Sequence, residues 1–228
     1  MLIMAIDSIS KITLIEVLQN MAQDIQNISA TLLTRMHENT KSEYIEKFYR
    51  QDLMSAKDRI SRNKDRIFDY LASGRLELVS YKEFYINSSL QMECAISKLE
   101  AGIYRFLLSY SIDKSDDSEA YKTIEGLVGE IYSSSQSLVD LLRSISTGTK
   151  GNSEKRKIIE ERFNKISESE GRGDIIYREG LARVLVKYSD KPSRLISFKE
   201  TIEYLEDCID CLYNASVYIK LIGFSGLA

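Results

Sequence analysis

Apolar residues recur along most of the chain with the spacing of helices that bury one face. Near the start of the chain the apolar positions alternate by three and four residues, the spacing of a seam between packed helices. They are Leu14, Leu18, Met21, Ile25, Ile28 and Leu32. A segment over roughly 118–146 repeats this spacing with Ile124, Val128, Ile131, Leu138, Leu142 and Ile145. The pattern predicts long helices that pack against one another.

Turn-forming residues divide this pattern into six predicted helices of three to ten turns. The chain has one proline and eleven glycines among 228 residues, fewer than the frequent chain reversals of a sheet-rich fold require. We therefore expect an all-α fold, an elongated helical bundle. The predicted breaks are 39–41, 73–75, 113–118, 147–153 and 189–192.

The chain contains an internal repeat. Residues 78–83, with the sequence LVSYKE, reappear 117 positions later as LISFKE at 195–200. The preceding helices also match, with Asp65 aligned on Asp174 if the second copy carries a longer connection. Self-similarity of this kind indicates tandem structural units. We expect two three-helix repeats that together form one structural domain: residues 1–113 and residues 114–228.

Composition and charge exclude several classes of protein. Thirty-one basic and thirty-four acidic residues give a net charge of −3, so no overall positive field attracts nucleic acid. No stretch reaches the roughly 18 to 20 apolar residues needed to span a bilayer. Three cysteines are too few to stabilise a chain of this length by disulfides, which suits a reducing cytoplasm.

Two Glu-x-x-x-Asp motifs stand out in the second repeat. They are Glu170 with Asp174 and Glu206 with Asp210. A spacing of four places both carboxylates of each motif on one face of a helix. The two motifs are equally distant from residue 190, at the centre of the predicted turn, so an antiparallel hairpin brings them level.

Four carboxylates that meet inside a bundle repel one another and lose hydration. Each must take up a proton or share a cation. Carboxylate sites between bundle helices are known to hold metal pairs, and ligation by oxygen alone favours hard ions such as magnesium, manganese or ferric iron. The alternative is a solvated acidic groove with Arg172, Arg178 and Arg183 as counter-charges.

Two stretches around these motifs resemble a known family. The sequences ISESEGRGDIIYREGL at 166–181 and FKETIEYLEDCID at 198–210 look like the C-terminal half of PhoU-like proteins, in the branch of Pit accessory proteins. The resemblance covers residues 158–224. It implies two three-helix repeats that bind metal through their Glu/Asp-x-x-x-Asp motifs. The implied cofactor is a divalent or trivalent ion: iron, magnesium, manganese or zinc.

The resemblance also implies a function. It describes a non-enzymatic, cytoplasmic regulator of phosphate uptake that acts on a Pit-type phosphate transporter or its signalling partners. Peripheral association with the inner face of the membrane and a homo-oligomer are both compatible with it. We expect partner contact through an exposed helical face or the apolar tail 221–228.

The first repeat departs from the motif. The positions equivalent to the four acids are Ser61, Asp65, Ser89 and Glu93, so two carboxylates remain of four. We therefore expect a metal site at Asp65 and Glu93 to be weakened or lost.

Two alternative functions stay open. A di-metal carboxylate enzyme or iron-handling bundle normally uses Glu-x-x-His pairs, and this chain has one histidine, His37. A metal-free helical adaptor is the second alternative. Enzyme activity is not expected, because one histidine cannot complete a set of nucleophile, base and orienting residue. Cys208 and Cys211 form a C-x-x-C within a helix, which we interpret as a pair of structural thiols.

Overall fold

The computed structural model describes residues 2–38, 42–72, 81–112, 118–146 and 152–225. These ranges are almost entirely helical and contain no strand, so the predicted all-α class is confirmed. The elements are α1 (Leu2–Glu38), α2 (Ser42–Phe48), the π-helical turn η1 (Tyr49–Leu53), α3 (Met54–Ala72), α4 (Lys82–Ile112), α5 (Ser118–Ser146), α6 (Asn152–Lys187) and α7 (Pro192–Ser225).

The segments α2, η1 and α3 follow one another without a break. Phe48 and Met54, which flank the π-helical turn, both have right-handed helical backbone angles. The described ranges therefore hold six long helical rods, as the apolar pattern predicts. The turn predicted at 189–192 is present, with α7 beginning at Pro192, where proline is favoured because the first helical N–H needs no partner. Most residues of the other predicted breaks lie outside the described ranges.

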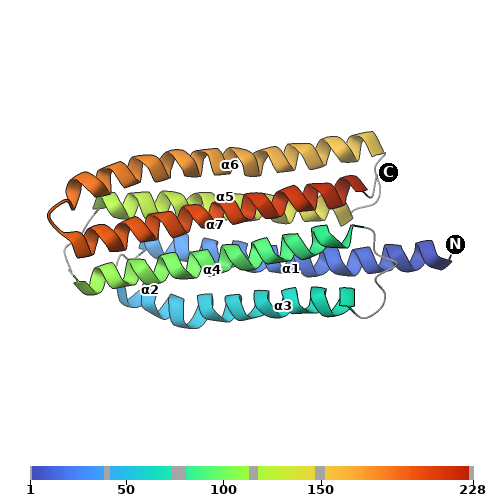
Figure 1. Cartoon of the computed structure of the whole chain (residues 1–228), viewed down its shortest axis with the longest axis horizontal. Helices are drawn as coiled ribbons and strands as arrows, with labels where there is room; N and C mark the ends of the chain where they lie inside the picture. Colours follow the sequence, from blue (N-terminus) through green and yellow to red (C-terminus); the bar gives the residue numbers. More distant parts are fainter. Residues whose placement is uncertain (1, 39–41, 73–80, 113–117, 147–151, 226–228) are drawn as a thin grey trace.

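All six rods run along the long axis of an elongated bundle (Figure 1). The most extensive contact is between α4 and α7, and α1 packs on α5. The outer helices are α3, which lies on α4 and α1, and α6, which lies on α5 and α7. The predicted repeat relates α1 to α5, α3 to α6 and α4 to α7, so equivalent inner helices are paired. The detailed equivalence of the two halves stays a prediction.

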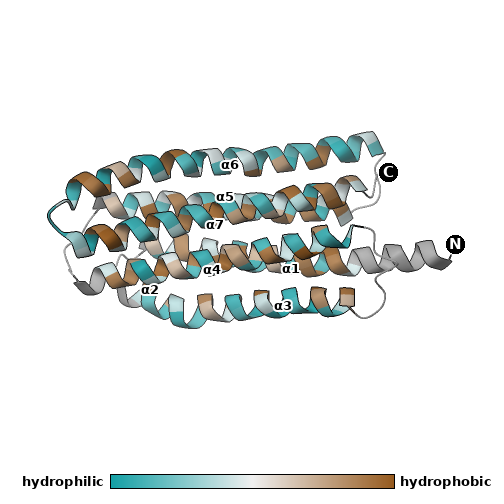
Figure 2. Ribbon diagram, viewed as in Figure 1, coloured by the Kyte–Doolittle hydropathy of each residue, from teal (hydrophilic) through white to brown (hydrophobic). Residues whose placement is uncertain are grey.

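One hydrophobic core runs through both halves of the bundle. Every apolar residue that the pattern places on the two predicted seams is buried, and all belong to a single cluster. The outer helices α3 and α6 are the most hydrophilic of the six rods (Figure 2). Removal of this apolar surface from water is the main contribution to the stability of the bundle.

The inner face of α6 is built largely from small residues rather than from its large apolar ones. Helical spacing places the large apolar residues Phe163, Ile166, Tyr177 and Leu181 on one face, but of these only Ile166 is fully buried. The buried residues of this helix are Ile159, Ile166, Ser169, Gly173, Gly180 and Val184. Small residues dominate because α6 approaches two neighbours closely. A Cβ atom on Gly173 would lie 2.8 Å from Cδ1 of Ile209 in α7, and one on Gly180 would overlap Thr123 in α5.

The end of α7 packs into the bundle. Ile222 and Gly223 are buried, and a Cβ atom on Gly223 would lie 2.8 Å from Cδ1 of Ile159. Residues 221–225 therefore form a helix end that packs on the bundle, with Leu221 the most exposed of them, and they offer little surface for the partner contact considered for the apolar tail. Residues 226–228 lie outside the described ranges. No helix in those ranges has a stretch long and apolar enough to cross a membrane.

The close approach of α6 to α5 predicts opposite effects of two alanine substitutions. Gly180→Ala should lower the free energy of unfolding by about 1–3 kcal/mol, because the new methyl group overlaps the buried Thr123 side chain. Gly171→Ala meets no atom within 4 Å and should raise it by about 0.5–1 kcal/mol, because glycine is the more flexible residue in the unfolded chain. Urea denaturation measures both. Equal effects of the two substitutions would contradict the close packing.

Candidate metal site

The four predicted carboxylates come together between α6 and α7. A side-chain hydrogen bond joins Glu206 to Asp174, and Glu170 is close enough to Asp174 and Asp210 for electrostatic repulsion by their charges. All four side chains are partly buried. The structure therefore brings the two motifs level across the hairpin, as their equal distance from the turn predicts. We call these four residues the carboxylate cluster.

Burial and mutual repulsion make it hard for the carboxylate cluster to lose all its protons. The pKa of Glu206 is raised to about 7, first by burial and then by the charges of its carboxylate neighbours. Burial raises the pKa of Glu170, and the charges of Asp174 and Asp210 add to the effect. The pKa of Asp210 is raised by burial, then by Asp174 and Asp207. Near neutral pH about half of the Glu206 side chains keep a proton.

Positive charges near the cluster are few. Arg178 forms an ion pair with Asp174 at 2.5 Å but is largely exposed. The other two arginines considered as counter-charges are paired elsewhere, Arg172 with Glu130 in α5 and Arg183 with Glu179. Of the three arginines that the alternative interpretation assigned to the acidic groove as counter-charges, only Arg178 pairs with a carboxylate of the cluster.

A fifth carboxylate borders the cluster and is neutralised from α4. Lys98 Nζ lies 2.7 Å from Oδ2 of Asp207. No positive charge is among the causes that shift the pKa of Glu206 or Asp210. These two carboxylates thus depend on a proton or on an added cation.

In the first half of the chain, a lysine neutralises the equivalent acidic residues. Lys64 Nζ and Ser61 Oγ each donate to Oε1 of Glu93 at 2.9 Å, and Lys64 also lies 3.4 Å from Asp65. The predicted repeat aligns Lys64 with Gly173, which has no side chain. An internal ammonium group therefore stands beside Asp65 and Glu93, and the expectation of a weakened first-half metal site gains a physical reason.

We did not predict this lysine from the sequence. The comparison of the two halves at their acidic positions does not include Lys64, which precedes Asp65 by one residue. The signal for it in the sequence is the exchange of Lys64 for Gly173 at equivalent positions of the repeat.

The donor set of the carboxylate cluster suits a hard cation, because all its ligand atoms are oxygens. No three histidine, cysteine or acidic side chains in the described ranges are arranged so that they could hold an ion as they stand. A bound ion would therefore draw the carboxylates together and take the place of the proton on Glu206. The one histidine of the chain, His37, follows Thr34 by three residues, so the sequence contains no Glu-x-x-His pair.

The three cysteines also meet, on the contact between α4 and α7. A side-chain hydrogen bond joins Cys94 to Cys211, and Cys208 is fully buried nearby. All three are free thiols. Burial raises the pKa of Cys208 and Cys211, which keeps them protonated and weakly nucleophilic. This environment fits the interpretation of the C-x-x-C as structural.

Comparison with known proteins adds no family. No family model matches the chain, and no curated protein matches it. The resemblance of residues 158–224 to PhoU-like proteins stays a prediction that rests on the quoted motifs.

The raised pKa of Glu206 predicts how the stability of the metal-free protein depends on pH. Between its ordinary value of 4.5 and the folded value of about 7, the folded protein binds more protons than the unfolded one. The stabilisation is therefore present below pH 4.5 and is lost as the pH rises through 7. Glu206→Gln should flatten this dependence and raise the melting temperature at pH 8 by about 2–4 °C.

Calorimetry in the presence of a chelator tests this prediction. The matched control is Glu179→Gln, which removes an exposed carboxylate from α6 and leaves the cluster intact. If the two variants show the same pH dependence, Glu206 is not the group that holds the proton.

Proposed function

We propose that this protein is a non-enzymatic regulator of phosphate uptake that binds a metal ion in the carboxylate cluster. It would act at the cytoplasmic face of the membrane by contact with a Pit-type phosphate transporter or its signalling partners. The observation that carries the metal-binding part is the meeting of four partly buried carboxylates beside one exposed arginine, with the pKa raised for Glu170, Glu206 and Asp210. The link to phosphate uptake is supported by the resemblance of residues 158–224 to Pit accessory proteins.

The comparison between the two halves supports a cation at the cluster. In the first half the ammonium group of Lys64 neutralises Glu93 and Asp65. In the second half glycine takes the place of lysine, and four carboxylates replace two. A metal ion would supply there the positive charge that the chain supplies itself in the first half.

A cation at this level would hold α6 against α7. The two helices touch at Gly173, where the absence of a side chain lets α6 approach Ile209 closely. Gly173 is the residue before Asp174, so helix packing and carboxylate repulsion act on the same turn. An ion that binds one arrangement preferentially stabilises it by mass action. The spacing and angle of the hairpin would then depend on the metal.

The turn end of the same hairpin offers a contact surface. Val186 is 80%, Ile196 54% and Leu185 47% exposed, all within a short distance along the chain of the turn. Lys187 and Lys191 lie between them in the sequence. Exposed apolar side chains next to lysines favour contact with a partner at the anionic surface of a membrane. A membrane transporter exposes its cytoplasmic parts at that surface. This surface, at one end of the bundle, takes the place of the packed tail (Figure 1).

The first test concerns the metal. Asp174→Asn combined with Asp210→Asn should remove most bound metal and leave the helical content unchanged, because two ligands are lost and repulsion is relieved. The control is Asp65→Asn combined with Glu93→Gln, the equivalent pair beside Lys64, which should not alter the metal content. Elemental analysis of protein purified without an affinity-tag metal, together with circular dichroism, provides the measurement.

Equal metal content in the parent and in the Asp174→Asn, Asp210→Asn variant would rule out the site. Metal-dependent turnover of a substrate that this variant abolishes would favour a di-metal enzyme. Metal-free parent protein that still regulates uptake would favour a helical adaptor.

The second test concerns the partner. Leu185→Ser combined with Val186→Ser should reduce co-purification with the transporter about tenfold, because loss of two apolar contacts removes roughly 1–2 kcal/mol of binding free energy. Metal binding and folding should not change, since both side chains are exposed. Ile175→Ser, an exposed apolar residue of the same helix far from the turn, is the matched control.

Phosphate uptake is measured in cells that carry each variant in place of the parent gene. Deleting the gene without any change in uptake or in its response to phosphate would contradict the proposed function.

A further inference from the structure

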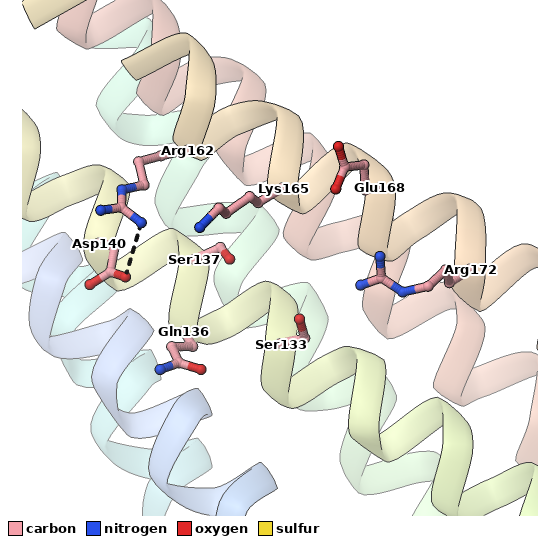
Figure 3. Close-up of a pocket in the computed structure, with 8 residues that line it drawn as sticks. All are labelled: Ser133, Gln136, Ser137, Asp140, Arg162, Lys165, Glu168 and Arg172. Atoms are coloured by element: carbon pink, nitrogen blue, oxygen red, sulfur yellow. Dashed lines mark ion pairs between the residues drawn. The ribbon is translucent and has the colours of Figure 1, made fainter. Parts of the chain in front are cut away.

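A polar groove of about 370 Å³ lies between α5 and α6 (Figure 3). Its lining includes three cations from α6, namely Arg162, Lys165 and Arg172. A carboxylate, Glu168, comes from α6 as well, and α5 contributes Ser133, Gln136, Ser137 and Asp140. The proposed function makes no use of this groove.

The register of the two helices sets the order of these groups. Facing residues of α5 and α6 are equally distant from residue 151 in the connection between them. They form four levels along the groove: Glu130 with Arg172, Ser133 with Ser169, Ser137 with Lys165, and Asp140 with Arg162. Acidic residues of α5 therefore face arginines at both ends, and hydroxyl groups face the middle.

The carboxylates at the two ends are engaged. Glu130 receives two hydrogen bonds of 2.9 Å from Arg172, and the hydroxyl group of the buried Ser169 donates to it as well. At the other end Asp140 lies 3.8 Å from Arg162 and 3.7 Å from Arg143. These acceptors hold the arginines in place and are not available to the middle of the groove.

The middle of the groove holds donors that are open to solvent and not engaged by protein acceptors. Within the described part of the chain, the exposed Lys165 forms no ion pair, and the half-buried hydroxyl groups of Ser133 and Ser137 form no hydrogen bond to another protein group. Figure 3 shows Lys165 extending from α6 toward Ser137, and the charge of Glu168, which also lines the groove, acts on Arg172. Other serines of α5 bond to backbone carbonyls of their own helix, for example Ser135 to Tyr132 at 2.9 Å. A ligand that only accepts hydrogen bonds and carries negative charge matches this donor set.

We propose that the groove binds a phosphate group, with Lys165 and the two serine hydroxyls as its principal contacts. The arginines at the ends are about 15 Å apart along α6, since ten residues of helix separate them. A groove of this length and volume accommodates a phosphate ester or a diphosphate as well as inorganic phosphate. The ligand is therefore defined by its phosphate group, which a free metabolite or a lipid headgroup can present.

The groove is separate from the carboxylate cluster. Ser169 and Arg172 face α5, whereas the neighbouring Glu170 and Asp174 face α7. The two sites lie on different sides of α6, so each can be tested while the other is intact. A groove that binds phosphate would give this protein a direct contact with the anion whose uptake it is proposed to regulate, but binding itself does not rest on that function.

Isothermal titration calorimetry with inorganic phosphate at fixed ionic strength tests the groove. A chelator is present, because a metal ion in the carboxylate cluster would itself attract phosphate. Lys165→Gln should weaken binding about tenfold, the effect of losing one charge-assisted hydrogen bond. Ser137→Ala should weaken it less, since a neutral donor is lost.

Two control variants keep the result specific. Lys157→Gln removes an exposed cation of α6 that pairs with Glu161 outside the groove, and it should bind phosphate as the parent does. The Asp174→Asn, Asp210→Asn variant should also bind phosphate normally, which separates failure of this site from failure of the metal site. Lys165 is exposed and unpaired in the described structure, so its replacement should leave the fold intact.

Vesicles distinguish the two sources of the phosphate group. The parent and Lys165→Gln are compared on phosphatidylcholine vesicles with and without phosphatidic acid. Binding of free phosphate that depends on Lys165 supports the groove with a small-molecule ligand. Binding only to vesicles with phosphatidic acid, again lost in Lys165→Gln, supports it with a lipid ligand. The proposal is overturned if neither probe binds at about 10 mM phosphate, or if Lys165→Gln and Lys157→Gln behave alike.

Discussion

Repulsion among four partly buried carboxylates is the constraint on which the second half of this bundle depends. The acids meet because α6 and α7 form a hairpin and because Gly173 lets the helices approach closely. In the absence of a cation the repulsion is relieved by a proton on Glu206, whose pKa is raised to about 7. The first half shows the other solution, an ammonium group from Lys64 beside Glu93. In the first half, the chain's own lysine thus neutralises the acidic residues. In the second half, the carboxylate cluster has no such lysine and keeps a proton instead.

The spacing of residues predicts the fold and the position of this cluster well. Apolar positions three and four apart predict buried seams such as that from Leu14 to Leu32, because a helix that packs in a bundle must bury one stripe. The cluster follows from helical period and hairpin symmetry alone: a spacing of four aligns each motif, and equal distance from the turn sets both at one level. Long-range order is predictable here because antiparallel helices joined by a short turn have a nearly fixed register.

Other features depend on side-chain detail that spacing does not convey. The inner face of α6 is built from Ser169, Gly173 and Gly180, which a search for large apolar residues overlooks. Arg172 pairs with Glu130 because α5 lies beside α6, a contact between distant parts of the sequence that the spacing within α6 does not reveal. The groove between α5 and α6 likewise emerges only when the register of those helices is known. Such features depend on the charge and size of the side chains at a helix contact. They can be predicted only when the facing residues of both helices are known.

The most direct test of the account is the proton balance of metal binding at the carboxylate cluster. Titration calorimetry with Mn²⁺ or Mg²⁺ in buffers of different ionisation enthalpy measures how many protons each bound ion releases. If the ion displaces the proton on Glu206, release should be about half a proton per ion at pH 7 and should vanish above pH 8.5. It should also be absent in Glu206→Gln. Binding without proton release across pH 6 to 8.5, or equal release from parent and variant, would contradict the claim that proton and cation compete for one cluster.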